Sequence, residues 1–182
     1  MITRAQWTAA HGQAMEMLRR SGVRLLGREV EAVQVLDFDL GDWETSGVGM
    51  LVLLATPAIV VKLLALQPGQ TCPEHRHVAA EGIPAKEETW RCAWGELVVG
   101  MPGEPTDRPR AVLPTGREQY YTSRREIVLT AGEQFTSPGD TPHWFQGGPD
   151  GAVTWAFETP SPFACGIFTD PAVTDPVAKI ED

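Results

Sequence analysis

Three of the four histidines of this chain lie in two short segments whose residue types suit a single metal site. His75 and His77 form the first segment, and Glu88 follows them in the chain. His143 belongs to the second segment, directly after the turn-forming residues 138–142. Three imidazoles and one carboxylate suit a divalent cation such as Mn²⁺, Fe²⁺, Co²⁺ or Ni²⁺. The sequence therefore predicts that His75, His77, Glu88 and His143 bind one metal ion.

The spacing of these residues indicates how strands would position them. His75 and His77 are two residues apart, so in an extended strand both imidazoles project from the same face. Glu88 opens a second alternating stretch, in which Trp90 shares its face. A buried carboxylate among apolar neighbours needs a cation or a proton to stay there. Glu87 is the alternative ligand, but its side chain would point to the opposite face.

An interpretation without a metal is also open. His75 and His77 would then be surface residues of a strand, and His143 would satisfy a buried hydrogen bond. A single histidine is most often explained in this way. Two segments in the right order, with Glu88 in register, favour the metal site.

The composition is that of one ordinary globular domain. Of the 182 residues, 42% are hydrophobic and 21% are charged, and we expect them to form a single domain over residues 1–182. The formal net charge is −9 and the sequence pI is about 4.9. An acidic chain of this kind has no electrostatic affinity for nucleic acid, so we expect no nucleic-acid partner.

We also expect no membrane span and no secretory signal. The first residues have no apolar run behind their charge. The longest apolar stretch, residues 47–66, is interrupted by Pro57 and Lys62, which fits buried strands better than a membrane helix. The three cysteines are odd in number and lack CxxC spacing, which is typical of reduced thiols. These features together predict a cytoplasmic protein.

The hydrophobic pattern predicts one helix followed by many strands. Residues 3–20 carry an apolar stripe at helical spacing, with Thr3 as N-cap and Gly22 just beyond the end. Residues 25–35 fit either a continued helix or the start of a strand. From about residue 33 the period changes to two, and Gly/Pro turns separate the predicted strands, which lie at 33–38, 48–54, 59–66, 89–92, 96–100, 125–129, 134–136, 143–146 and 153–157.

This element pattern predicts a mainly β fold. Many short strands without alternating helices are typical of a β-barrel or jelly roll. We expect a single jelly-roll β-barrel over residues 33–170, preceded by a helical segment at 1–22. Residues 101–117, rich in proline and charge, read as a surface excursion between two strands. The tail after Thr169 reads as a capping strand or a loose end.

The spacing of the ligands resembles the two motifs of the cupin superfamily, whose jelly-roll barrel encloses a metal at one end. The matching positions are Gly69, His75, His77, Glu88 and Gly95 for the first motif and Gly132, Pro138 and His143 for the second. The first motif departs at residues 78–87, which make a longer loop than the usual pattern has. We expect this loop to rim the pocket.

The sequence around the ligands resembles that of the short D-lyxose isomerase family of bacteria. The likeness rests on residues 68–77, 86–92, 141–146 and 167–171. It implies a homodimeric cupin that binds Mn²⁺ and interconverts D-lyxose with D-xylulose, often with D-mannose and D-fructose as secondary substrates. Carried over by position, the four predicted ligands hold the metal, and Lys62 and Lys86 belong to the substrate pocket. Residues 163–166 differ from the family, which puts the sugar preference in doubt.

The expected chemistry requires a base beyond the metal ligands. Aldose–ketose isomerisation moves a proton between C1 and C2, while a divalent cation polarises the carbonyl. Glu158, directly after the predicted strand 153–157, is the preferred base, and Glu74 and Glu87 are alternatives. Lys86 is expected to hold a substrate oxygen as a point charge. For Lys62 the alternative is a stem along the barrel wall with its ammonium reaching solvent.

Other interpretations share the same ligands. A cupin oxygenase would hold Fe²⁺ in this site and use its open positions for O₂. A non-catalytic module would use the metal to bind a sugar without turnover. A sugar-phosphate isomerase would need a cationic cluster, which Lys62, Lys86 and Arg76 would have to assemble in space. Trp144 and Phe145 are assigned to the core rather than to a sugar-stacking surface.

Overall fold

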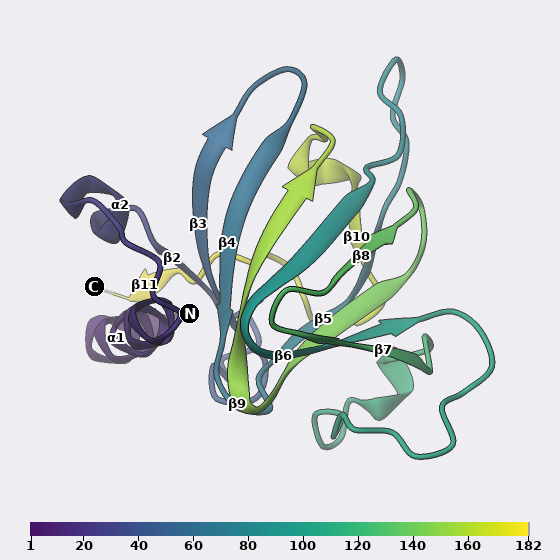
Figure 1. The fold of residues 1–182 in the computed structure, drawn as a ribbon, viewed down its shortest axis with the longest axis horizontal. Helices are drawn as coiled ribbons and strands as arrows, with labels where there is room; N and C mark the ends of the chain where they lie inside the picture. Colours follow the sequence, from purple (N-terminus) through teal and green to yellow (C-terminus); the bar gives the residue numbers. More distant parts are fainter. Residues whose placement is uncertain (182) are drawn as a thin grey trace.

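The structure, a computed structural model, describes residues 1–181 as a curled antiparallel sheet with a helix packed on its outer face (Figure 1). The helices are α1 (Arg4–Arg20) and α2 (Gly27–Glu31), with short 3-10 turns η1 (Glu118–Tyr120) and η2 (Phe163–Cys165). The strands are β1 (Ile2–Thr3), β2 (Gln34–Leu36), β3 (Val48–Ala55), β4 (Val60–Leu66), β5 (Thr71–His77), β6 (Glu88–Met101), β7 (Arg125–Thr130), β8 (Gln134–Ser137), β9 (His143–Glu158), β10 (Gly166–Phe168) and β11 (Ile180–Glu181).

Helix α1 begins and ends where the sequence predicts. Thr3 accepts a hydrogen bond from the amide of Gln6, whose side chain accepts one from the amide of Thr3, so a capping box closes the N-terminus. Its buried face packs on Leu51, Leu63 and Val153 of three neighbouring strands, through Ala14, Met17 and Leu18. None of the described helices is long and apolar enough to cross a membrane.

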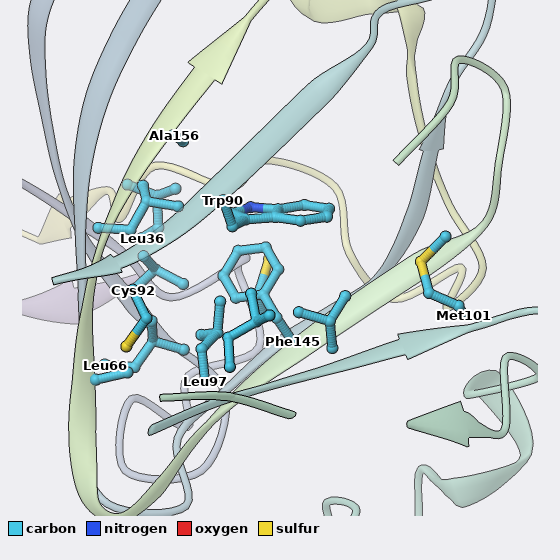
Figure 2. Close-up of a cluster of buried hydrophobic side chains, with 14 of the residues drawn as sticks. Leu36, Leu66, Trp90, Cys92, Leu97, Met101, Phe145 and Ala156 are labelled. Carbon is cyan, nitrogen blue, oxygen red and sulfur yellow. The ribbon is translucent and has the colours of Figure 1, made fainter. Parts of the chain in front are cut away.

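The main sheet is a half-barrel rather than a closed cylinder. Its strand order is β10-β5-β9-β4-β3-β2, and β6 adds to β9 while also pairing with β7 and β8. The predicted mainly β fold with an N-terminal helix is confirmed. The inner, concave face carries the main core, in which Trp90 lies over Phe145 with Leu36, Leu97 and their neighbours around them (Figure 2).

Two long strands replace four of the predicted short ones. The expected turn at residues 93–95 is wrong, because β6 runs without a break from Glu88 to Met101. Its register against β9 shifts on either side of this segment, and Gly95 adopts φ 75°, so the glycine marks an irregularity within a strand. The strands predicted at 143–146 and 153–157 likewise form the single strand β9, whose register against β6 shifts between Gly147 and Ala152 and in which Gly151 adopts φ 89°.

The ambiguous segment 25–35 contains both elements that it suggested. Helix α2 occupies five of its residues, and β2 then starts at Gln34. Strand β2 is shorter than predicted because Phe38 and Asp39 both adopt φ 59°, a left-handed conformation that no strand continues. The tail returns to the N-terminus, where β11 pairs in parallel with β1.

Candidate metal centre

Three strands of the half-barrel bring the four predicted ligands together on its inner face. Strand β5 carries His75 and His77, β6 begins with Glu88, and β9 begins with His143. One ligand atom of each residue lies within 4.8 Å of the others, and His75 and His143 are direct cross-strand partners. The Nε2 atoms of His77 and His143 lie 3.4 and 3.7 Å from Oε2 of Glu88.

A β-bulge in β5 sets the direction of the first two imidazoles. Cys72 pairs with Phe145 and His75 pairs with His143, so between these pairs two residues of β5 oppose one of β9. Without an extra residue, positions 72 and 75 would face opposite sides of the sheet. With the bulge at residues 73–74, Cys72 and His75 both line the same cavity. The histidine spacing alone did not reveal this device.

Backbone carbonyls fix which nitrogen of two imidazoles faces the centre. Nδ1 of His75 donates to the carbonyl of Pro73, and Nδ1 of His143 donates to that of Thr141, each over 2.8 Å. A carbonyl only accepts, so these Nδ1 atoms carry the proton and the Nε2 lone pairs are left for a ligand. The Nε2 atoms of His77 and His143 and Oε2 of Glu88 are buried without a hydrogen-bond partner.

The pKa shifts of the ligands favour the protonation states that bind a cation. Burial, together with the neighbouring histidines, places the pKa of His75 well below its ordinary value. Burial also lowers the pKa of His143 to about 4. Burial by itself would raise the pKa of Glu88, but the charge of Lys86, together with the neighbouring His77 and His143, holds it well below the usual range. Neutral imidazoles and an ionised carboxylate are the protonation states that bind a divalent metal, so the residues fit the predicted ion.

The turn before His143 is tied to the other ligand strand. Asp140 adopts φ 56°, its amide donates to the carbonyl of His77, and its carboxylate accepts from Arg76 over 3.0 Å. A side chain at Gly139 would overlap the backbone of Ala85 in the loop 78–87. Only a glycine therefore lets this turn pack against that loop, which contains Lys86 and continues directly into Glu88.

Beside the four ligands lies a cavity of about 260 Å³ with one charged wall. Lys62 and Lys86 both donate to Oε2 of Glu158, over 2.8 and 3.0 Å. Nζ of Lys86 also lies 3.3 Å from Oε2 of Glu88, so its ammonium joins the two carboxylates. Burial would lower the pKa of Lys86, but Glu88 and Glu158 raise it. This wall combines two carboxylates with two ammonium groups, next to the ligands.

The rest of the cavity lining, the apolar wall, is mainly apolar. It is formed mainly by residues from β2 to β5, from β9 and from the C-terminal segment: Leu36, Phe38, Val48, Met50, Leu64, Cys72, Phe145, Phe168, Pro176 and Val177. Phe168 had a signal, since it belongs to the segment 167–171 on which the family resemblance rests. Phe38 had none, because only its left-handed backbone places it there.

The remaining predicted residues take different places. Of the three candidate bases, Glu158 lines the cavity, whereas Glu87 is exposed and Glu74 is bonded to Thr122, Ser123 and Thr169. Trp144 packs in a separate cluster with Tyr121 and Val98, while Phe145 belongs both to the core and to the cavity wall. In the segment 163–166, Gly166 reaches the cavity, and the side chain of Phe163 lies outside the described part of the chain.

This combination of a curled antiparallel sheet and a buried cluster of three histidines and one glutamate defines a metal-binding cupin. The chain is 44% identical over 178 residues to the D-lyxose ketol-isomerase of Cohnella laeviribosi, covering 97% of this chain and 98% of that protein. It is 40% identical to the D-lyxose/D-mannose isomerase of Thermosediminibacter oceani over the full length of both. The chain belongs to the D-lyxose ketol-isomerase family.

Solved structures support the fold independently. The L-ribose isomerase of Cellulomonas parahominis superposes with a TM-score of 0.79 at 19% identity, covering 98% of this chain and 97% of that one. The L-ribose isomerase of Acinetobacter sp. DL28 gives a TM-score of 0.76 at 20% identity over 94% of each chain. No protein-family model matches the chain. At such low identity the structural likeness concerns the fold alone.

Replacing His143 by alanine removes one of the four converging ligand atoms. We expect Mn²⁺ binding to weaken by more than about 100-fold, beyond the effect typical of losing a residue that only supports a ligand. Isothermal titration of metal-free protein with Mn²⁺ measures this. His11→Ala is the control, because His11 lies on α1 with its ring nitrogen on the carbonyl of Val30. Wild-type affinity in His143→Ala would remove that residue from the ligand set.

Proposed function

We propose that this protein is a metal-dependent aldose–ketose isomerase that converts D-lyxose to D-xylulose and D-mannose to D-fructose, with Mn²⁺ as its metal. Two full-length relatives with these sugars in their names support the substrate class. The observation that carries the reaction type is Glu158, a buried carboxylate beside the ligand cluster and not part of it. Co²⁺, Ni²⁺ and Fe²⁺ suit the same ligands and are the expected substitutes.

The metal would be held by His75, His77, Glu88 and His143. When bound, a divalent cation polarises the sugar carbonyl and offsets the negative charge that develops on its oxygen. Three of these ligands, His75, His77 and Glu88, line the cavity, so the reacting C1–C2 end of the sugar belongs beside them. The apolar wall then surrounds the rest of the sugar and excludes bulk water from the reacting carbons.

Glu158 is the base that moves the proton between the two reacting carbons. It takes the proton from C2 of the aldose and returns it to C1, while the proton of the C2 hydroxyl passes to the oxygen on C1, so that the ketose forms without an added cofactor. Both lysines bind the same oxygen, Oε2, and Oε1 takes part in neither bond. That second oxygen is the proton carrier in this proposal. Lys86 and Lys62 position the carboxylate and donate hydrogen bonds to sugar oxygens as the charge develops.

The charges of the cavity favour a free sugar over a sugar phosphate. Both ammonium groups are already bound to carboxylates, since Lys62 binds Glu158 and Lys86 binds Glu158 and Glu88. Arg76, the third cation that a phosphate site would have needed, pairs with Asp140 and is not among the residues that line the cavity. A dianionic phosphate would therefore meet no unpaired cation among these side chains.

The central test is turnover of free sugars by the metal-reconstituted protein. Metal-free protein given Mn²⁺ under anaerobic conditions should form ketose from D-lyxose and D-mannose but not from D-mannose 6-phosphate, as followed by ketose assay. In D₂O, proton transfer through Glu158 should leave deuterium at C1 of the ketose, which NMR detects. A need for O₂ would instead indicate an oxygenase. Sugar-dependent stabilisation without any ketose would indicate a binding module.

Glu158→Gln tests the assignment of the base. The amide keeps the size of the side chain but does not take up a proton, so kcat should fall by about 10²–10⁴-fold. Mn²⁺ affinity should stay close to that of the wild type, because Glu158 is outside the ligand cluster. Glu87→Gln is the matched control, since Glu87 directly precedes Glu88 but is exposed. This variant should keep full activity. Unchanged turnover in Glu158→Gln would eliminate this residue as the base.

We further propose a cytoplasmic homodimer, in line with the family resemblance. Leu54, Val61 and Phe157 are cross-strand neighbours on the outer face of the sheet, and Leu54 and Phe157 are 47% and 36% exposed. An exposed apolar row of this kind suits a contact with a second copy. Sedimentation equilibrium of the wild type should give twice the chain mass of 19.9 kDa. Leu54→Lys should shift the population toward the monomer mass. A wild-type chain of single mass would refute the dimer.

A further inference from the structure

Ser123 lies at a point where the supports of two ligand strands meet, although it is remote from the ligands in sequence. Its amide donates to Oε2 of Glu74 over 2.7 Å, next to His75 in β5. Its hydroxyl donates to the carbonyl of Pro142 over 3.0 Å, and its own carbonyl accepts from the indole of Trp144 over 2.7 Å. The last two contacts hold the residues on either side of His143. A single buried serine therefore bonds to a direct neighbour of each of two ligands.

Glu74 occupies the β-bulge that turns His75 toward the cavity. It is 1% exposed, and its carboxylate accepts from the hydroxyls of Thr122 and Thr169, over 2.8 and 2.9 Å, as well as from the amide of Ser123. Its carbonyl also accepts from the amide of Thr169. These bonds hold both the side chain and the backbone of the residue. They therefore fix the bulge on which the orientation of His75 depends.

The segment that carries Thr122 and Ser123 is anchored elsewhere along its length. In the structure, the excursion between β6 and β7 spans residues 102–124 and therefore includes both of them. It leaves the sheet as the teal loop at the lower right of Figure 1. Arg117 pairs with the buried carboxylate of Asp170, and Val112 exchanges two hydrogen bonds with the side chain of Gln146. Because these anchors hold the excursion, Ser123 offers Glu74 and Pro142 a fixed partner.

We propose that Glu74 and Ser123 form a clamp that positions His75 and His143 for metal binding. Neither residue lines the cavity, so both are positioning residues that act through the ligands beside them. The bulge would otherwise be free to relax, and a shift of one residue in a strand moves a side chain to the other face. The clamp concerns the metal part of the proposed function and does not depend on the identity of the sugar.

The test compares two equivalent Glu→Gln substitutions in metal-free protein titrated with Mn²⁺ and Co²⁺. In Glu74→Gln only one of the two side-chain oxygens remains and the charge is lost, so the bonds from the amide of Ser123 and from the hydroxyls of Thr122 and Thr169 are not all kept. We expect Mn²⁺ to bind about 10–100-fold more weakly, as is typical when the support of a ligand is lost. The visible absorption of bound Co²⁺ should also change, because it reports the geometry of the ligands. A role in folding alone would leave that spectrum as in the wild type.

Glu126→Gln is the matched control. Glu126 also accepts hydrogen bonds from backbone amides of the excursion, those of Arg110 and Ala111, but these bonds do not involve the residues next to His75 or His143. Its Mn²⁺ affinity and Co²⁺ spectrum should match the wild type. Thr122 provides a variant that does not threaten folding, because it is exposed. Thr122→Val should weaken Mn²⁺ binding a few-fold, and Thr122→Ser should restore it.

The outcomes separate the clamp from the proposed reaction. Wild-type affinity and spectrum in Glu74→Gln would overturn the clamp, as would an equal loss in Glu126→Gln, which would indicate a general loss of stability. A wild-type protein that binds neither Mn²⁺ nor Co²⁺ would also overturn it. If the wild type binds Mn²⁺ and Glu74→Gln does so more weakly, while no sugar is isomerised, the clamp stands and the proposed reaction fails.

Discussion

Burial of the Glu88 carboxylate among three imidazoles is the constraint on which the rest of this structure depends. A buried charge that loses its partner costs about 3–5 kcal/mol. Here the Glu88 carboxylate pairs with the buried ammonium of Lys86 and faces the site for a divalent cation. His75 and His143 add donor atoms without adding charge, because burial lowers the pKa of both. The scaffold must therefore hold four ligand atoms from three strands close together before any metal arrives.

A half-barrel meets this requirement through interruptions of its regular pairing. In a regular strand, side chains alternate between faces, so the inner face receives every second residue. The bulge in β5 breaks that period, so that Cys72 contributes to the cavity wall and His75 to the ligand cluster. On β9 the ligand His143 is the first residue and Glu158 the last, so one long strand supplies both a ligand and the carboxylate that faces the cavity. Regular pairing alone would not place these groups together.

The sequence predicts the chemistry of the site better than the means of holding it. His75, His77, Glu88 and His143 were identified from residue type and spacing, and helix α1 from its capping residues, because these signals are local. Continuity of β6 was not predicted, since Gly95 signals a turn as readily as a strand irregularity. Ser123 carries no local signal, because its partners lie on β5, on β9 and in the turn before β9, and meet it only in the folded chain.

The charged wall and the apolar wall of the cavity would contact different parts of a bound sugar. The charged wall places Glu158 and its two lysines beside the ligand cluster, where the proposed proton transfer would require them. The apolar wall, with Phe38, Phe168 and Val177, offers contact area but no charged partner to the far hydroxyls. Selection must then depend on the configuration at the reacting end more than on groups further along the sugar. That division accounts for how one pocket would serve both a pentose such as D-lyxose and a hexose such as D-mannose, which share their configuration at C2 and C3.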